Sequence, residues 1–192
     1  MPNFIRQINW VDLFVITLLL RVCYVAAGTG ILIESFKIAG TIFATYFSLH
    51  YYSDLAGFLK DRFGSEYIPL TLLEFISFFI LAFGVYLLFV FLRKIFCRFV
   101  KMEAVENLNK WGGLIIGVIR GLLLISLFTF GFVLSNISYF QESLQHSYTG
   151  RRIFYLAPSV YRWSWENIAS KFSSDDKMNE AVLKAEDKIK EK

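Results

Sequence analysis

The chain has 192 residues, of which 56% are hydrophobic and only 19% are charged, and its formal net charge is +4. A soluble domain of this length carries more charge, so the composition excludes an ordinary water-soluble protein and indicates a membrane protein. The small basic excess predicts no nucleic-acid partner, because no basic stripe with interleaved aromatic residues lies outside the apolar runs.

Apolar runs long enough to cross a bilayer as helices, which takes about 20 residues, occur four times. They cover residues 8–27, 31–49, 70–92 and 112–134. We therefore predict an all-α fold, a polytopic membrane protein with four transmembrane helices in residues 8–135. An aromatic amphipathic C-terminal segment over 136–172 and a charged tail over 173–192 are expected to complete it.

The first span begins with a helix-capping pattern. Asn9 is followed three residues later by Asp12, roughly the spacing of a capping box, and we expect Asp12 to cap this helix. A cleaved signal peptide is the alternative, since residues 25–27 resemble a cleavage site. Asp12 and Arg21 inside the run favour a retained helix, because the apolar region of a signal peptide is short and uncharged.

The second span follows a tight turn at residues 28–30, which contain two glycines. Glu34 and Lys37 occupy its first turns, three residues apart and on one face of the helix. A polar connection over residues 53–66 is expected to lead to the third span.

The third span follows Pro69, and Glu74 near its start is a second candidate cap, because a helix N-terminus tolerates an anion. The loop over residues 93–111 is short and strongly basic, so the positive-inside rule predicts that it is cytoplasmic. Two crossings then place both termini outside. Arg151 and Arg152 lie near a membrane end on that outer side. Under the positive-inside rule they favour the opposite orientation.

The fourth span carries a ridge of small residues at Gly113, Gly117 and Gly121. In lipid this spacing lets another helix approach closely, so we expect a helix-packing face there. Arg120 lies about 12 Å along the axis from Gly112 and, at 100° per residue, close to the direction of Gly113.

A cation on this face has two interpretations. Arg120 pairs with a buried carboxylate or lines a polar path, or its side chain extends along the helix to reach lipid phosphates. If it is paired, Glu34 is the favoured partner, since the predicted topology puts both on the cytoplasmic side. Asp12 and Glu74 belong near the outer side.

The residues after the fourth span are predicted to be turn-like as far as Thr149 and amphipathic from Arg151 to Phe172. Aromatic and apolar residues recur there at helical spacing: Tyr161, Trp165, Ile168 and Phe172. A helix lying on the membrane surface and a helix packed across the mouth of the bundle both fit this pattern. The tail, with a predicted helix start at residues 174–176, is either a frayed helix or a docking segment.

Motifs typical of catalysis and of metal binding do not occur. The sequence holds no GxSxG, HExxH, Walker or dinucleotide-binding pattern. Cys23 and Cys97 lack metal-ligand spacing, and His50 and His146 are isolated from other ligand types. We therefore predict no enzyme, no metal and no cofactor.

Several segments together resemble the colicin V production (CvpA) family of bacterial inner-membrane proteins. They are the opening Asn9-Trp10-Val11-Asp12, the turn Gly30-Ile31-Leu32-Ile33-Glu34, the end of the second span at His50-Tyr51-Tyr52, and Leu108-Asn109-Lys110-Trp111-Gly112-Gly113 through Gly117-Val118-Ile119-Arg120-Gly121-Leu122. Thr29 and Ile33 stand where the family usually carries basic residues, and Asn109 stands where it often has Asp.

This resemblance implies a multi-pass inner-membrane protein linked to colicin V (toxin) production or export and to envelope homeostasis. The lack of catalytic groups and the glycine ridge favour an accessory or assembly factor that works by contacts. The alternative is a small oligomeric channel or transporter with Arg120 and Glu34 at a polar path. Expected partners are the lipid bilayer and, depending on the role, a second copy of the chain or an export or envelope protein.

Overall fold

The computed structural model describes residues 9–63, 68–99, 106–172 and 177–190, and every element in these ranges is helical. Four of the helices are long and apolar enough to cross a membrane. They are α1 (Trp10–Thr29), α2 (Ile31–Phe63), α3 (Leu70–Phe99) and α4 (Glu106–Leu134). The predicted all-α class with four candidate spans is confirmed.

Helical structure suits these runs because a bilayer offers no hydrogen-bonding partner to the backbone. An α-helix satisfies its N–H and C=O groups internally, and prolines are missing from the interior of all four helices. Pro69 lies immediately before α3 and its carbonyl accepts hydrogen bonds from the N–H groups of Leu72 and Leu73. The proline thus begins the helix without interrupting it.

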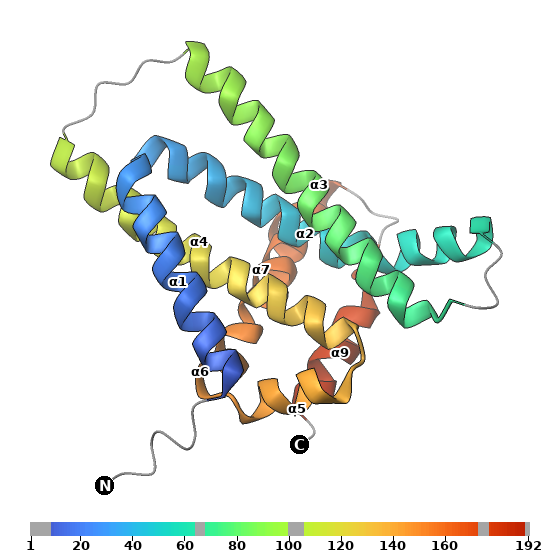
Figure 1. Cartoon of the computed structure of the whole chain (residues 1–192). Coiled ribbons are helices and arrows are strands. Elements are labelled where there is room, and N and C mark those ends of the chain that lie inside the picture. The colour runs from blue at the N-terminus through green and yellow to red at the C-terminus, as the bar shows by residue number, and fades with distance from the viewer. Residues whose placement is uncertain (1–8, 64–67, 100–105, 173–176, 191–192) are drawn as a thin grey trace, which may run out of the picture.

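Helix α4 lies at the centre of the bundle. Within its candidate span 56% of the residues are buried, against 17% in α3. Helix α1 packs against α4, and α2 packs against both α4 and α3 (Figure 1). Helices α1 and α3 also carry many exposed apolar side chains, as expected of faces that meet lipid.

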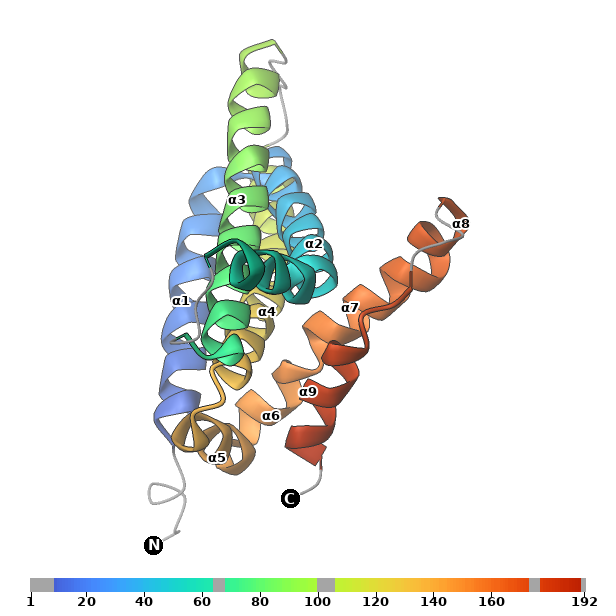
Figure 2. The same cartoon turned by 90° about the vertical axis from the view of Figure 1, so that its right-hand side faces the viewer.

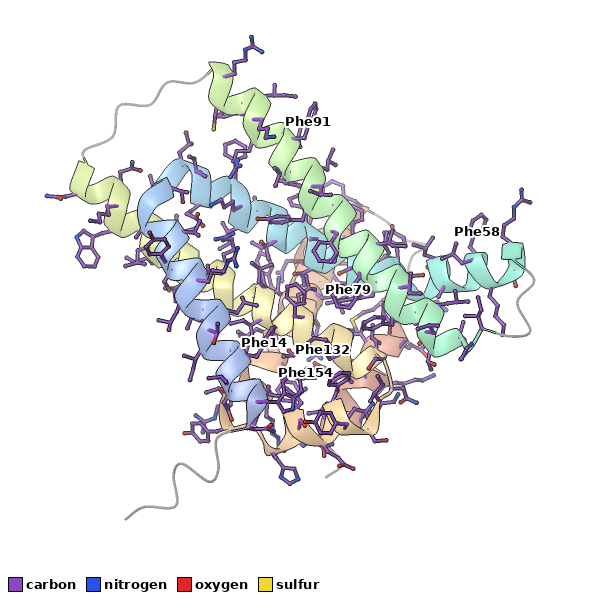
Figure 3. All side chains as sticks on the ribbon, viewed as in Figure 1. Phe14, Phe58, Phe79, Phe91, Phe132 and Phe154 are labelled. Carbon is purple, nitrogen blue, oxygen red and sulfur yellow. The ribbon has the colours of Figure 1, made fainter. Side chains whose placement is uncertain are left out.

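Aromatic side chains fill the core at one end of the bundle. Phe130 stacks on Phe154 and packs against Phe78 and Tyr52, and all four are almost fully buried. Figure 3 shows that Phe58 and Phe91 point away from the bundle, where both are more than half exposed. This aromatic part of the core is therefore formed by α2, α3, α4 and the C-terminal helices, while Val11 and Val15 of α1 complete the core.

Helix α2 runs much further than predicted, since the expected polar connection at 53–63 continues the helix. Figure 1 shows that the helix changes direction before its turquoise C-terminal part. The side-chain amide of Asn179 donates to the backbone carbonyls of Leu49 (2.9 Å) and His50 (3.1 Å). A polar group inserted at helix carbonyls is a recognised cause of such bends.

Six short elements follow α4: α5 (Ser138–His146), α6 (Tyr148–Phe154), α7 (Leu156–Ser164), the π-helical turn η2 (Trp165–Ala169), α8 (Ser170–Phe172) and α9 (Glu180–Lys190). The turn-like stretch predicted before Thr149 is therefore largely helical. The predicted amphipathic segment from Arg151 to Phe172 is broken into several helices. Figure 2 shows α6, α7 and α8 as an oblique band beside the bundle, with α9 next to α7.

The C-terminal segment packs partly onto the bundle and partly projects from it. Tyr161 on α7 is buried beside α2, whereas Phe172 on α8 is 88% exposed. Val182 and Ile189 on α9 are buried in the common core, so this part of the tail is a docked helix. The predicted helix start at residues 174–176 lies outside the described residues.

The predicted limits of the other spans also shift. The expected start at Ile8 lies outside the described residues, and α1 begins at Trp10. Helix α3 continues to Phe99 and α4 begins at Glu106, so only residues 100–105 of the predicted loop 93–111 remain between them, outside the described residues. The charged end of α3 and the charged start of α4 were not predicted as helix, because hydropathy marks the apolar part of a helix and not its full length.

Candidate functional site

The connection between α1 and α2 is a single residue, Gly30, which has a φ of 79°. This backbone conformation favours glycine. The neighbourhood adds a second reason, because a Cβ on Gly30 would lie 2.5 Å from Oδ1 of Asn109. Both the backbone conformation and the position of Asn109 therefore favour glycine at this turn.

The predicted glycine ridge of α4 faces α1 and this turn. A Cβ on Gly113 would lie 2.9 Å from the carbonyl carbon of Gly30, and one on Gly117 would lie 2.2 Å from Cβ of Ala26. A Cβ on Gly121 would be 3.2 Å from side-chain atoms of Leu19 and Val22. The first two glycines permit a close backbone approach that any larger residue would prevent.

Asn109, near the start of α4, holds the start of α2. Its Oδ1 accepts a hydrogen bond of 2.8 Å from the backbone N–H of Ile31. The first N–H groups of a helix have no partner within the helix, so an outside acceptor stabilises its beginning. An aspartate at this position offers the same acceptor.

Glu34, in the first turn of α2, has a side chain with 0% exposure. Its Oε1 accepts hydrogen bonds from Oγ1 of Thr29 at 2.6 Å and from Nζ of Lys37 at 2.5 Å. Lys37 is also within 3.4 Å of the Thr29 hydroxyl. The end of α1 and the first turns of α2 thus meet at one carboxylate oxygen.

The other oxygen of Glu34 faces α4. Arg120 Nε lies 3.0 Å from Glu34 Oε2, within ion-pair distance, although the N–H does not point at the oxygen with hydrogen-bond geometry. The Arg120 side chain is only 6% exposed. The structure therefore brings the two residues of the expected pair together and directs Arg120 into the bundle.

The three ionised side chains form a buried cluster, which we call the Glu34 cluster: Glu34, Lys37 and Arg120. One carboxylate is shared by two cations, so the cluster carries one excess positive charge. Removing charges from water is costly, and mutual attraction offsets that cost only if each charge keeps a partner. The cluster is therefore sensitive to loss of its single anion.

Asp12 does more than cap α1. Its Oδ2 accepts from the backbone N–H of Asn9 at 3.3 Å, which is one half of the predicted capping box. Its Oδ1 accepts from the Ser147 hydroxyl at 2.7 Å and from the backbone N–H of Thr149 at 3.0 Å. The carboxylate thus joins the start of α1 to the start of α6.

Glu74 does not take the expected cap position. Helix α3 begins at Leu70, and its first turn contains no acidic residue. Glu74 lies beyond that turn and is half-buried. The sequence placed the start of the helix well but not the position of this carboxylate relative to it.

Among the described residues, no group of three or more His, Cys, Asp or Glu side chains could hold a metal ion. Cys23 and Cys97 are both free thiols.

Sequence reasoning missed three contributors to these sites: Thr29, Asn109 and Asn179. Thr29 and Asn109 had been noted only as departures from a family pattern. Polar residues that interrupt apolar or glycine-rich segments next to a turn were the available signal. Asn179 lies in a charged stretch of the sequence, where one more polar residue does not stand out.

The sequence model of a family described as Colicin V production protein matches residues 11–156. This range includes α1 to α4, the Glu34 cluster and the glycine ridge. No curated protein and no solved structure matches the chain.

Proposed function

Since the chain belongs to the colicin V production protein family, we propose that it is a non-enzymatic accessory or assembly factor in toxin export and envelope homeostasis. It would act by contacts that its helices and C-terminal segment make with an export or envelope protein. The four apolar helices make it a membrane protein. We place it in the inner membrane, as the bacterial resemblance implies.

One observation carries this proposal. Glu34, the fully buried acidic residue of the first turn of α2, is engaged by Thr29, Lys37 and Arg120 of its own chain. Side chains committed to one another in this way fasten helices together. Both oxygens of the Glu34 carboxylate are therefore engaged within the chain.

The alternative, an oligomeric channel with Glu34 and Arg120 on a polar path, needs these side chains to face water. Their exposures of 0% and 6% favour the structural role within one chain. A channel would also need several copies, since four helices are few for a pore.

An export assay tests the accessory role. A host that lacks its own family member but produces colicin V would be supplied with this chain or with the Glu34→Gln variant. We expect the wild type to restore toxin release and the variant, at equal membrane abundance, to restore less. Equal release with and without the wild-type chain would overturn the proposal.

Flux through liposomes tests the channel alternative separately. Vesicles containing the purified wild-type chain at high density are expected to remain tight to ions and small solutes. Flux that disappears in a folded Arg120→Ala variant would replace the accessory role by a channel.

We further propose that loop 93–111 is cytoplasmic and that both termini are outside. Reporter fusions at Asp54, at Lys101 and after Lys192 test this orientation. We expect a cytoplasmic signal only at Lys101, and a cytoplasmic signal after Lys192 would reverse the assignment.

A further inference from the structure

A cavity of ≈ 500 Å³ is lined by residues of all four long helices and by none of the Glu34 cluster. Helices α1 and α3 form two of its walls and make little direct contact. Its size falls in the range of ligand sites, about 300–1,000 Å³. The proposed function gives this cavity no role.

Most of the cavity wall is apolar. Phe79 and Phe83 of α3 and Leu124, Leu127 and Phe128 of α4 supply hydrocarbon surface. In a bilayer such a hollow does not stay empty, because its lining would lose dispersion contacts on one side. A flexible hydrocarbon chain is the occupant that this surface suits.

Arg21 on α1 lines the same cavity and is exposed. The packing face of α1 explains its direction, since Leu19, Val22 and Ala26 meet the glycines of α4. At about 100° per residue, Arg21 lies about 100° around the helix from Val22 and about 160° from Leu19, so it points away from this contact. It reaches the cavity rather than the α1–α4 contact.

The described residues offer Arg21 no acidic partner, hydrogen bond or ion pair, in contrast to Arg120. An unpaired arginine within an apolar span is costly and is usually matched by an anion. Arg21 lies about 12 Å along the axis from the end of α1, close enough for its long side chain to extend towards the headgroup layer.

Tyr86 supplies a second polar group to the cavity. It lies on α3 and is half-buried, and no described residue hydrogen-bonds to its hydroxyl. Because α1 and α3 run in the same direction, Arg21 and Tyr86 both lie beyond Phe79 towards the end of the bundle that carries the α1–α2 turn. The polar and apolar linings are thus separated along the membrane normal, as headgroup and chain are in a lipid.

We propose that this cavity is a binding site for an anionic phospholipid, with an acyl chain against the phenylalanines and the phosphate beside Arg21. A guanidinium can donate two parallel hydrogen bonds to a phosphate. The net negative charge of the headgroup selects it over a zwitterionic lipid, whose ammonium group opposes Arg21. The proposal does not depend on the role in export.

Native mass spectrometry of the delipidated full chain tests the site. The protein in neutral detergent is mixed with equal amounts of phosphatidylglycerol and phosphatidylcholine that have identical acyl chains. We expect the wild type to bind the anionic lipid about fivefold more, the factor expected of one arginine near a charged headgroup. Arg21→Gln is expected to bring the two lipids to parity, and Arg21→Lys to retain part of the preference.

Two further variants separate the site from general effects. Arg98→Gln removes an exposed cation from the last turn of α3 and is expected to keep the preference. Ala82→Phe places a ring in the cavity and is expected to lower binding of both lipids. Excess glycerol phosphate should not compete, because it lacks the chain.

Three results would overturn the proposal: no headgroup preference in the wild type, the same preference in Arg21→Gln, or an equal loss in Arg98→Gln. If Arg21→Gln does not fold, the Ala82→Phe and Arg21→Lys results decide. Undiminished lipid binding by folded Ala82→Phe would also refute the cavity as the site.

Discussion

Asn109 accepts a hydrogen bond of 2.8 Å from the backbone N–H of Ile31, across 78 residues of sequence. This bond fixes the beginning of α2 to the beginning of α4, directly beside the one-residue turn at Gly30. The Asn109 amide also occupies the space that a side chain on this glycine would need. The two residues therefore depend on each other, and both lie within the range matched by the family.

Replacing the cap tests this dependence. Asn109→Ala is expected to lower the free energy of unfolding by about 1 kcal/mol, the usual value of a lost helix cap. Asn109→Asp keeps the acceptor and should retain most of the stability. Unfolding in mixed micelles, followed by circular dichroism, measures both, and equal losses would show that the cap contributes nothing.

The Glu34 cluster predicts an asymmetric response to charge removal. Glu34→Gln leaves two buried cations without an anion and should destabilise by about 3–5 kcal/mol. Arg120→Gln should cost less, because Lys37 still balances Glu34. Glu166→Gln, at an exposed position of η2, serves as the control. A larger loss for Arg120→Gln than for Glu34→Gln would contradict the shared carboxylate.

The glycine ridge predicts a contrast between two alanine substitutions. Gly117→Ala forces a methyl group against Ala26 and should destabilise by about 1–3 kcal/mol, the usual cost of overpacking. Gly84→Ala, on α3, meets nothing within 4 Å and should keep or raise stability, by up to about 1 kcal/mol, because alanine is the better helix former. Thermal unfolding in one detergent compares the two, and equal midpoints would exclude a close α1–α4 contact.

Asp12 predicts a local effect at the other end of α1. Asp12→Asn removes the charge that Ser147 and Thr149 bind and should destabilise by about 2 kcal/mol. Amide hydrogen exchange should accelerate in α6 more than in α3. Glu142→Gln on the exposed side of α5 is the matched control, and uniform acceleration along the chain would point to a global rather than a local role.

The four spans could be located from the sequence because apolar length follows from lipid physics. The same physics led to the predictions of a glycine packing face and of a pairing between Arg120 and Glu34. Apolar length, small-residue spacing and the cost of a buried charge can be read from residue types. The continuation of α2 beyond Leu49 could not, since a polar helix end looks like a loop. The links from Asp12 to Ser147 and from Asn179 to α2 depend on tertiary contacts between distant segments.

The amide of Asn179 also donates to the hydroxyl of Ser53 at 3.1 Å. A direct bond of this length requires both residues to lie on one side of the membrane. The chain between them must then cross the bilayer an even number of times, and α3 and α4 supply two such crossings. An even number of crossings excludes every arrangement in which only one of α3 and α4 spans the membrane. This holds for either orientation of the protein.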